Sequence, residues 1–297
     1  MNAETRLPFH TILVAADLTH EGSRALGYAQ QIAALHQSTL VVVHTIDPAG
    51  YAFPEGVPAT AHVDEAARAG LEAIEQETRA QGIPVHSVME TSVVYDRLLQ
   101  AAADNRANLL VLGTRAAGKL GRAALGVAAR RLVAKAPCPV LTVPPDADTF
   151  IESPGRWRRV LVATDFSATS LSALEHAQYV VDSHLAIVHA AGASAGEDRD
   201  RYLERLRFLA PSEEPLSYPV EHIVSMGEAG NEIIQHAREF EADLIVLGSP
   251  LRDPTPEDIG RSTLLQVIAN VSCPVLCIPP AQAASAAEVA KEFAFSH

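Results

Sequence analysis

The chain has 297 residues, of which 48% are hydrophobic and 20% are charged, and its formal net charge at pH 7 is −13. This length suits two domains of about 150 residues each, and the composition is typical of a folded protein. The negative charge argues against a nucleic-acid partner, because nucleic-acid-binding surfaces need clustered Lys and Arg. No apolar run reaches the roughly 20 residues of a membrane span, and no signal peptide is apparent, so we expect a cytoplasmic protein without a membrane partner.

The first half of the chain alternates strand-like apolar runs with helical patterns. The glycine at position 82 follows a long helical pattern and is a natural C-cap. In chain order, we predict strand His10–Asp17, helix Thr19–Leu35, strand Thr39–Ile46, helix Val63–Ala80, strand Ile83–Met89, helix Val93–Asn105, strand Asn108–Gly113, helix Arg122–Lys135 and strand Pro139–Val143.

The second half repeats the same order of elements. Its predicted elements are strand Trp157–Asp165, helix Ser167–Val181, strand Leu185–Ala190, helix Arg199–Leu209, strand His222–Ser225, helix Glu228–Phe240, strand Asp243–Gly248, helix Ser262–Asn270 and strand Pro274–Ile278. Matching residues keep nearly constant offsets: Asp17 and Asp165 are 148 apart, and Gly113 and Gly248 are 135 apart. The repeat predicts two domains, over residues 1–146 and 157–280, with a linker over 147–156 and a short helical tail over 281–297.

Alternating strands and helices with short connections predict an α/β fold, in which each half is a doubly wound parallel sheet with helices on both faces. The three cysteines, Cys138, Cys273 and Cys277, are expected to be reduced and buried. Neither they nor the twelve histidines have the spacing of metal ligands, and no catalytic triad or nucleophile elbow is apparent. We therefore expect no metal site and no enzyme activity beyond slow ATP hydrolysis.

Several segments resemble the universal stress protein family. These are the strand ending in Asp17, the VVVH strand, the VLG strand before a glycine-spaced loop and the closing APCPVLTVP, which VLVATDFS, IVHA, ADLIVLGS and SCPVLCIP repeat in the second half. The resemblance covers almost the whole chain and identifies it as a tandem member. It implies a five-stranded parallel sheet of the adenine nucleotide alpha hydrolase type in each half, pairing of the last strands into an intrachain pseudo-dimer, and nucleotide binding in part of the family.

Nucleotide-binding members carry Gly, two residues, Gly, nine residues, Gly and then Ser or Thr. The matching positions in the first half are Gly113, Ala116, Gly126 and Val127, so two match and two depart. Ala116 can adopt a left-handed conformation at a cost of about 1–2 kcal/mol, and Val127 keeps its backbone N–H. The resemblance therefore implies ATP or a related adenine nucleotide, with Mg²⁺, as the candidate cofactor of this half.

Three basic residues, Arg115, Lys119 and Arg122, lie in the same loop and favour an anionic ligand. The alternative is that they are ordinary exposed residues around a helix start. Asp17 ends the first strand beside the switch point of the sheet, and the resemblance implies that it lies near the adenosine moiety. His44 and His189 end strands at the same rim, where a structural role is favoured over a catalytic one.

The second half is a poorer nucleotide site. At the four motif positions it has Gly248, Leu251, Arg261 and Ser262, and the intervening segment RDPTPED adds acids that repel phosphate and prolines that lack an N–H. We expect no nucleotide there, or a weaker one, in a degenerate site formed by Asp165, Gly248, Ser249 and Ser262. Asp165 could equally cap the following helix.

Two functions remain open on these residues. One is a stress regulator that binds an adenine nucleotide in its first half. The other is a nucleotide-free interaction protein, or a binder of a different small ligand, whose protein partners the sequence does not identify. In either case two chains could associate as a homodimer, which nothing in the sequence fixes.

Overall fold

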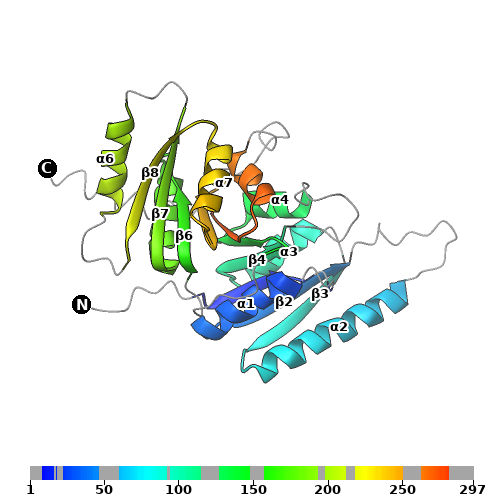
Figure 1. Cartoon of the computed structure of the whole chain (residues 1–297). Coiled ribbons are helices and arrows are strands. Elements are labelled where there is room, and N and C mark those ends of the chain that lie inside the picture. Colours follow the sequence, from blue (N-terminus) through cyan, green and yellow to red (C-terminus); the bar gives the residue numbers. More distant parts are fainter. Residues whose placement is uncertain are drawn as a thin grey trace.

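The computed structural model describes residues 9–16, 18, 23–46, 60–91, 94–114, 127–147, 157–192, 198–211, 218–249 and 262–280. Asp17, the loop 115–126 and the predicted tail helix over 281–297 lie outside these residues. Within them the two halves form one ten-stranded sheet in the order β3-β2-β1-β4-β5-β10-β9-β6-β7-β8. Figure 1 shows the long helix α2 beside β3 at one end of this sheet and α6 beside β8 at the other.

Five strands of the first half pair in parallel, with β1 between β2 and β4. Helix α2 is followed by Gly82 at a φ of +79°, which confirms the predicted C-cap. The elements are β1 Thr11–Ala15, α1 Ser23–His36, β2 Thr39–Ile46, α2 Thr60–Ala80, β3 Val85–Thr91, α3 Val94–Asp104, β4 Leu109–Gly113, α4 Val127–Lys135 and β5 Val140–Val143.

The second half repeats this arrangement, with β6 between β7 and β9. Its elements are β6 Trp157–Ala163, α5 Ala168–Val180, β7 Val181–Ala191, α6 Arg199–Leu209, β8 Val220–Met226, α7 Ala229–Glu239, β9 Leu244–Gly248, α9 Thr263–Asn270 and β10 Val275–Ile278. Strand β7 begins four residues before the predicted Leu185. It starts at Val181, the C-cap of α5, which pairs with Trp157 across an irregular register, and the polar residues 182–184 conceal this part of the strand in the sequence.

Successive side chains of each strand belong alternately to two hydrophobic cores, one on each face of the sheet. In β1, for example, Ile12 and Val14 join one core and Leu13 joins the other. Helices α1, α2, α5 and α6 cover the first core, and α3, α4, α7 and α9 cover the second. The strands are apolar on both faces because helices cover both, as the sequence pattern predicted.

The last strands of the two halves, β5 and β10, join the sheets by antiparallel pairing. Leu141 lies opposite Leu276, and the Thr142 hydroxyl donates to the Val275 carbonyl oxygen at 3.2 Å. This is the pairing that the family resemblance implied. Because all other pairs are parallel, the strands of the two halves run in opposite directions. The strands of one half therefore have their carboxyl ends on the side of the sheet where the strands of the other half have their amino ends.

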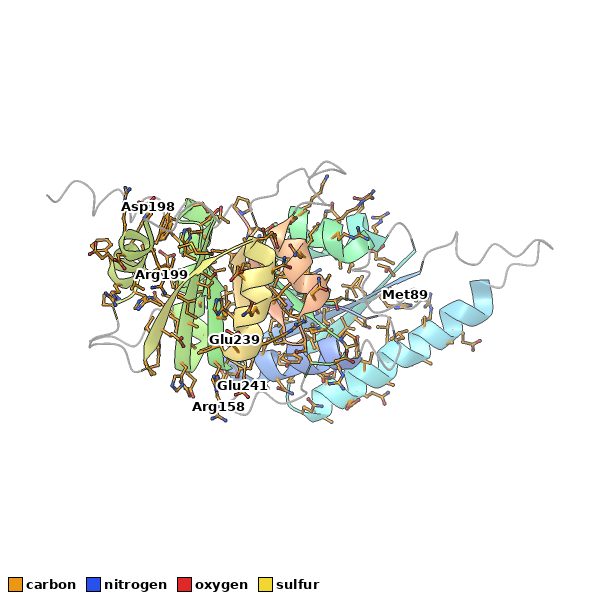
Figure 2. The ribbon with its side chains drawn as sticks, turned by 45° about the horizontal axis from the view of Figure 1, so that its top comes forward. Met89, Arg158, Asp198, Arg199, Glu239 and Glu241 are labelled. Carbon is orange, nitrogen blue, oxygen red and sulfur yellow. The ribbon has the colours of Figure 1, made fainter. Side chains whose placement is uncertain are left out.

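Acidic residues form hydrogen bonds and an ion pair at the amino-terminal end of β6. The Asp243 carboxylate accepts hydrogen bonds from the backbone N–H groups of Arg158 and Arg159, each at 3.0 Å. Arg159 also pairs with Glu241 at 3.2 Å. Figure 2 shows Arg158 and Glu241 close together at this edge, beyond the end of α7. These acids therefore lie at the end of the strands away from the carboxyl-terminal rim.

A buried serine joins the halves a second time. The Ser249 side chain is 1% exposed, and its hydroxyl donates to the Val133 carbonyl oxygen at 3.2 Å. Val133 lies in the last turn of α4, where carbonyl groups have no partner within the helix. Ser249 thus satisfies a helix-terminal carbonyl of the other half.

Replacing Ser249 by alanine is expected to lower the free energy of unfolding by about 1 kcal/mol, because a buried carbonyl loses its hydrogen bond. Urea denaturation of the full chain measures this change. The control is Ser272→Ala at an exposed serine, which should change stability by less than about 0.5 kcal/mol. Equal effects of the two substitutions would contradict the assigned role of Ser249.

Candidate functional site

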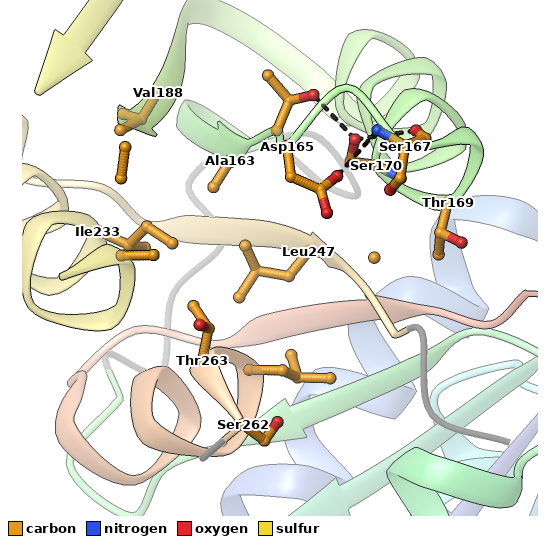
Figure 3. Close-up of a pocket in the computed structure, with 15 residues that line it drawn as sticks. Ala163, Asp165, Ser167, Thr169, Ser170, Val188, Ile233, Leu247, Ser262 and Thr263 are labelled. Carbon is orange, nitrogen blue, oxygen red and sulfur yellow. Dashed lines mark hydrogen bonds between the residues drawn. The ribbon is translucent and has the colours of Figure 1, made fainter. Parts of the chain in front are cut away.

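Each half has a point at which the chain leaves two neighbouring strands in opposite directions. The first strand lies between the second and the fourth in both halves, so a crevice opens at the carboxyl ends of β1 and β4, and of β6 and β9. In the second half this crevice is a cavity of about 380 Å³. Figure 3 shows its walls, which come from β6, β7 and β9 and from the first turns of α5, α7 and α9.

The cavity is mainly apolar with one carboxylate at its rim. Strand and helix side chains such as Val188, Ile233 and Leu247 form the walls, and Asp165 follows the end of β6. Sequence analysis proposed Asp165 but missed the walls, because α7 and β7 contribute them through apolar residues that look like ordinary core. Thr263, in the first turn of α9, lies against the same cavity in Figure 3.

Hydrogen bonds hold the Asp165 carboxylate ionised. Its Oδ1 accepts from the backbone N–H of Ser167 at 2.9 Å. Burial opposes ionisation, but hydrogen bonds from the Ser167 amide and from the hydroxyls of Ser167 and Ser170 outweigh it and lower the pKa of Asp165 below its ordinary value. The Ser167 hydroxyl caps α5 by accepting from the Ser170 N–H at 3.3 Å. Asp165 therefore both supports the helix start and presents a negative charge to the cavity.

The turn after the first strand has the same strained conformation in both halves. Phe166 and Leu18 have φ values of 64° and 57°, in the left-handed region that larger side chains rarely adopt. In the second half, the Thr164 hydroxyl accepts from the Phe166 N–H at 2.9 Å and shares a 2.8 Å hydrogen bond with the Ser170 hydroxyl. Local polar contacts therefore stabilise the conformation that places the neighbouring aspartate.

A histidine anchors this turn in each half. His189 Nδ1 donates to the Thr164 carbonyl oxygen at 2.8 Å, and His44 Nδ1 donates to the Ala16 carbonyl oxygen at 2.7 Å. A carbonyl can only accept, so the Nδ1 atom carries a proton in both residues. The His189 ring also packs on Phe166 at a centroid distance of 4.6 Å. These contacts give both histidines the structural role that the sequence favoured.

Gly248 permits close packing of a helix on the end of β9. A Cβ atom at this position would lie 2.8 Å from Thr169 Cγ2 and 2.9 Å from the Thr169 backbone carbon. The first turn of α5 therefore lies against the backbone of Gly248, at the floor of the cavity. Sequence analysis assigned this glycine to the degenerate nucleotide site and missed the contact, because Thr169 is 79 residues away in the chain.

Ser262, the hydroxyl that the second half retains from the family motif, caps its own helix. Its Oγ accepts from the Leu265 N–H at 3.3 Å at the start of α9, and the residue also lines the cavity. Ser249 does not line the cavity, since its hydroxyl bonds to α4. Of the four residues predicted for this half, three therefore surround the cavity and one joins the two halves.

The structure describes only the borders of the first-half site. Strand β4 ends at Gly113, and α4 begins at Val127. The other predicted residues lie outside the described residues; these are Asp17, Arg115, Ala116, Lys119, Arg122 and Gly126. The order of elements around this place is the same as around the cavity of the second half.

The cysteines have no partner for redox or metal chemistry in the described part of the chain. All three are free thiols, with Cys138 and Cys277 buried and Cys273 partly exposed. Burial raises the pKa of Cys138 and of Cys273 to about 12, so both remain protonated at neutral pH. Among the described residues, no group of three or more His, Cys, Asp or Glu side chains could hold a metal ion, and no helix is long and apolar enough to cross a membrane.

Comparisons with known proteins match both halves. The family model of the Universal stress protein family matches residues 8–144 and 156–279. A protein of Thermus aquaticus, described as a universal stress protein in the QAH/OAS sulfhydrylase 3′ region, is 35% identical over 143 residues, which are 46% of this chain and 98% of the relative. A universal stress protein of Mycolicibacterium smegmatis is 30% identical over 175 residues, which are 56% of this chain and 58% of the relative.

Solved structures match more than nine tenths of the chain. A universal stress protein from Archaeoglobus fulgidus has a TM-score of 0.74 at 22% identity, covering 92% of this chain and 97% of its own. A putative universal stress protein from Pseudomonas aeruginosa has a TM-score of 0.64 at 22% identity, covering 95% of this chain and 98% of its own. These likenesses show that the fold is shared over both halves.

Replacing Gly248 by alanine is expected to lower the free energy of unfolding by about 1–3 kcal/mol, because the added Cβ meets the Thr169 backbone. The matched control is Gly192→Ala, where no atom lies within 4 Å of the added Cβ, and it should change stability by less than about 0.5 kcal/mol. Urea denaturation measures both. A neutral Gly248→Ala substitution would show that α5 and β9 are not in close contact.

The lowered pKa of Asp165 makes its contribution to stability depend on pH. A depressed carboxyl pKa stabilises the fold above the pKa of the unfolded chain, about 3.9, and this stabilisation is lost as the pH falls through the folded value. Wild type is therefore expected to be more stable than Asp165→Asn by a constant amount between about pH 5 and pH 7, and the difference should shrink below about pH 4. Denaturation at a series of pH values tests this, and a difference that grows on acidification would contradict it.

Proposed function

Because the chain belongs to the universal stress protein family, we propose that it is a cytoplasmic stress-response protein that binds ATP or a related adenine nucleotide through its first half. The observation that supports a small-molecule site at a switch point of this fold is the cavity at the equivalent place in the second half. Its volume of about 380 Å³ falls within the range of about 300–1,000 Å³ for small-molecule sites. The first half has the same strand order at its own switch point.

The loop that would hold the phosphates differs in charge between the halves. Residues 115–126 of the first half contain three basic and no acidic residues. They lead into α4, whose first N–H groups and positive dipole end favour an anion. Arg115, Lys119 and Arg122 are thus assigned to the phosphates, and Asp17 to the adenosine moiety. Mg²⁺ would be bound together with the triphosphate.

Backbone groups carry the rest of this proposed site. Gly113 ends β4, and Gly126 precedes α4 in the sequence. Val127 offers a backbone N–H where binding relatives also offer a hydroxyl. Ala116 must adopt the left-handed conformation, at about 1–2 kcal/mol, which a charge-assisted phosphate contact of about 1.5–3 kcal/mol can offset.

The second candidate function is a nucleotide-free interaction protein or a binder of a different small ligand. The departures at Ala116 and Val127 favour it, as does the use of the Ser262 hydroxyl for capping α9. In this case the joined halves would present a surface to protein partners. Nucleotide affinity separates the two functions directly.

Equilibrium titration of the full chain with a fluorescent ATP analogue is expected to saturate at micromolar concentrations. Gly126→Asp should weaken this binding by at least about tenfold, because a carboxylate next to the phosphates repels them. Gly192→Asp adds the same charge in the second half, where the added Cβ meets no atom within 4 Å, and should leave the affinity unchanged. No saturable binding at about 1 mM would contradict the proposal and favour the second function.

A further inference from the structure

We propose that helix α6 of one copy of the chain binds helix α2 of a second copy, so that the protein self-associates head to tail. The last strands of the two halves are already paired with one another within the chain, so a second copy needs a different surface. Figure 1 shows α6 and α2 at opposite ends of the ten-stranded sheet, beside its outermost strands β8 and β3. The inference is independent of the proposed nucleotide site.

Helix α6 carries the most exposed large hydrophobic side chain of the described residues. Phe208 is 82% exposed, and the next such side chain in the described part of the chain is Leu35 at 39%. The opposite side of α6 packs into the first core through the fully buried Leu206 and the partly buried Tyr202. Because side chains seven residues apart lie on the same side of a helix, Phe208 shares the outward side of α6 with Arg201. An apolar ring and a cation thus face solvent together.

Helix α6 is also basic, although the chain as a whole has a net charge of −13. It contains four arginines and two acidic residues. Arg201 and Arg207 are exposed and form no ion pair within the described residues. Arg201 and Arg205 are four residues apart, a spacing at which like charges repel on a helix surface. Carboxylates on a partner surface would therefore neutralise charges that the described residues leave unmatched.

Helix α2 has the complementary surface. It contains five acidic residues and two arginines. Ala66, Ala69 and Ala73 recur along its exposed side at spacings of three and four residues, which makes a shallow apolar strip. Glu72 and Glu77 are exposed on either side of this strip, and neither forms an ion pair among the residues that the structure describes.

The two surfaces match in charge and in shape. The Phe208 ring can pack on the alanine strip, because alanine side chains leave room for it. The long side chains of Arg201 and Arg207 then reach the carboxylates of Glu72 and Glu77. A contact between two helix surfaces is small, so the association is weak and depends on concentration. Each copy has one α6 and one α2, so a bound copy leaves one of each free and further copies can add.

Analytical ultracentrifugation of the full chain is expected to give a weight-average mass above 31.6 kDa that rises between about 10 μM and 1 mM. Arg201→Glu with Arg207→Glu should weaken this association at least about tenfold, because like charges then face each other. Glu72→Arg with Glu77→Arg should do the same. The chain with all four substitutions should associate again, since the charges are exchanged across the contact and the net charge is restored.

Phe208→Ser should weaken the association without any change of charge. The control for net charge is Arg97→Glu with Arg238→Glu, at exposed arginines of α3 and α7, which should leave the association unchanged. Circular dichroism and the urea midpoint of each variant establish that it is folded.

Three results would overturn the inference: a mass that stays at 31.6 kDa, association that survives the α6 substitutions, or no recovery in the fourfold variant. A parallel sedimentation assay uses vesicles that contain phosphatidylserine. Wild type that binds these vesicles but does not self-associate would assign the α6 surface to an anionic membrane instead, and would also overturn the inference.

Discussion

The antiparallel pairing of β5 with β10 determines how everything else in the molecule is arranged. It turns two five-stranded parallel sheets into one sheet of ten strands, with Leu141 opposite Leu276 at the junction. The same pairing reverses the strand direction between the halves, so the two switch points lie at opposite ends of the strands. The Ser249 hydroxyl bond to the α4 carbonyl of Val133 adds a buried contact across the junction. The two candidate sites are thus distant from one another yet share one continuous hydrophobic core on each face.

Within this frame the two copies have kept one part of the site and changed another. The turn after the first strand is alike in both copies. Each turn has a residue with positive φ, which is Leu18 in the first half and Phe166 in the second. In each, a histidine ring N–H donates to a carbonyl oxygen of the turn, from His44 to Ala16 and from His189 to Thr164. A strained conformation persists only where its surroundings determine it, and here a buried or half-buried imidazole does so. The loop after the fourth strand differs, from basic in the first half to acidic and proline-rich in the second. The two copies therefore share the turn after the first strand and differ in the composition of the later loop.

Much of the fold followed from the sequence, because strand periodicity and the repeat offsets are local or regular signals. The α/β class, the order of the elements and the β5–β10 junction were predicted and are confirmed. The start of β7 was wrong by four residues, since the polar residues 182–184 hide strand pairing that only tertiary contact with Trp157 specifies. The cavity walls and the contact of Gly248 with Thr169 were also missed, because both depend on elements far apart in the chain. The assignment of the first-half residues, Asp17 and the loop 115–126 above all, stays a prediction.

The central proposal is that the first half binds an adenine nucleotide at its switch point. A crystal structure of the full chain grown with a non-hydrolysable ATP analogue tests it most directly. The account predicts density for the triphosphate analogue between Asp17 and the 113–127 segment of the first half. An empty first half at a saturating concentration of the analogue would contradict it.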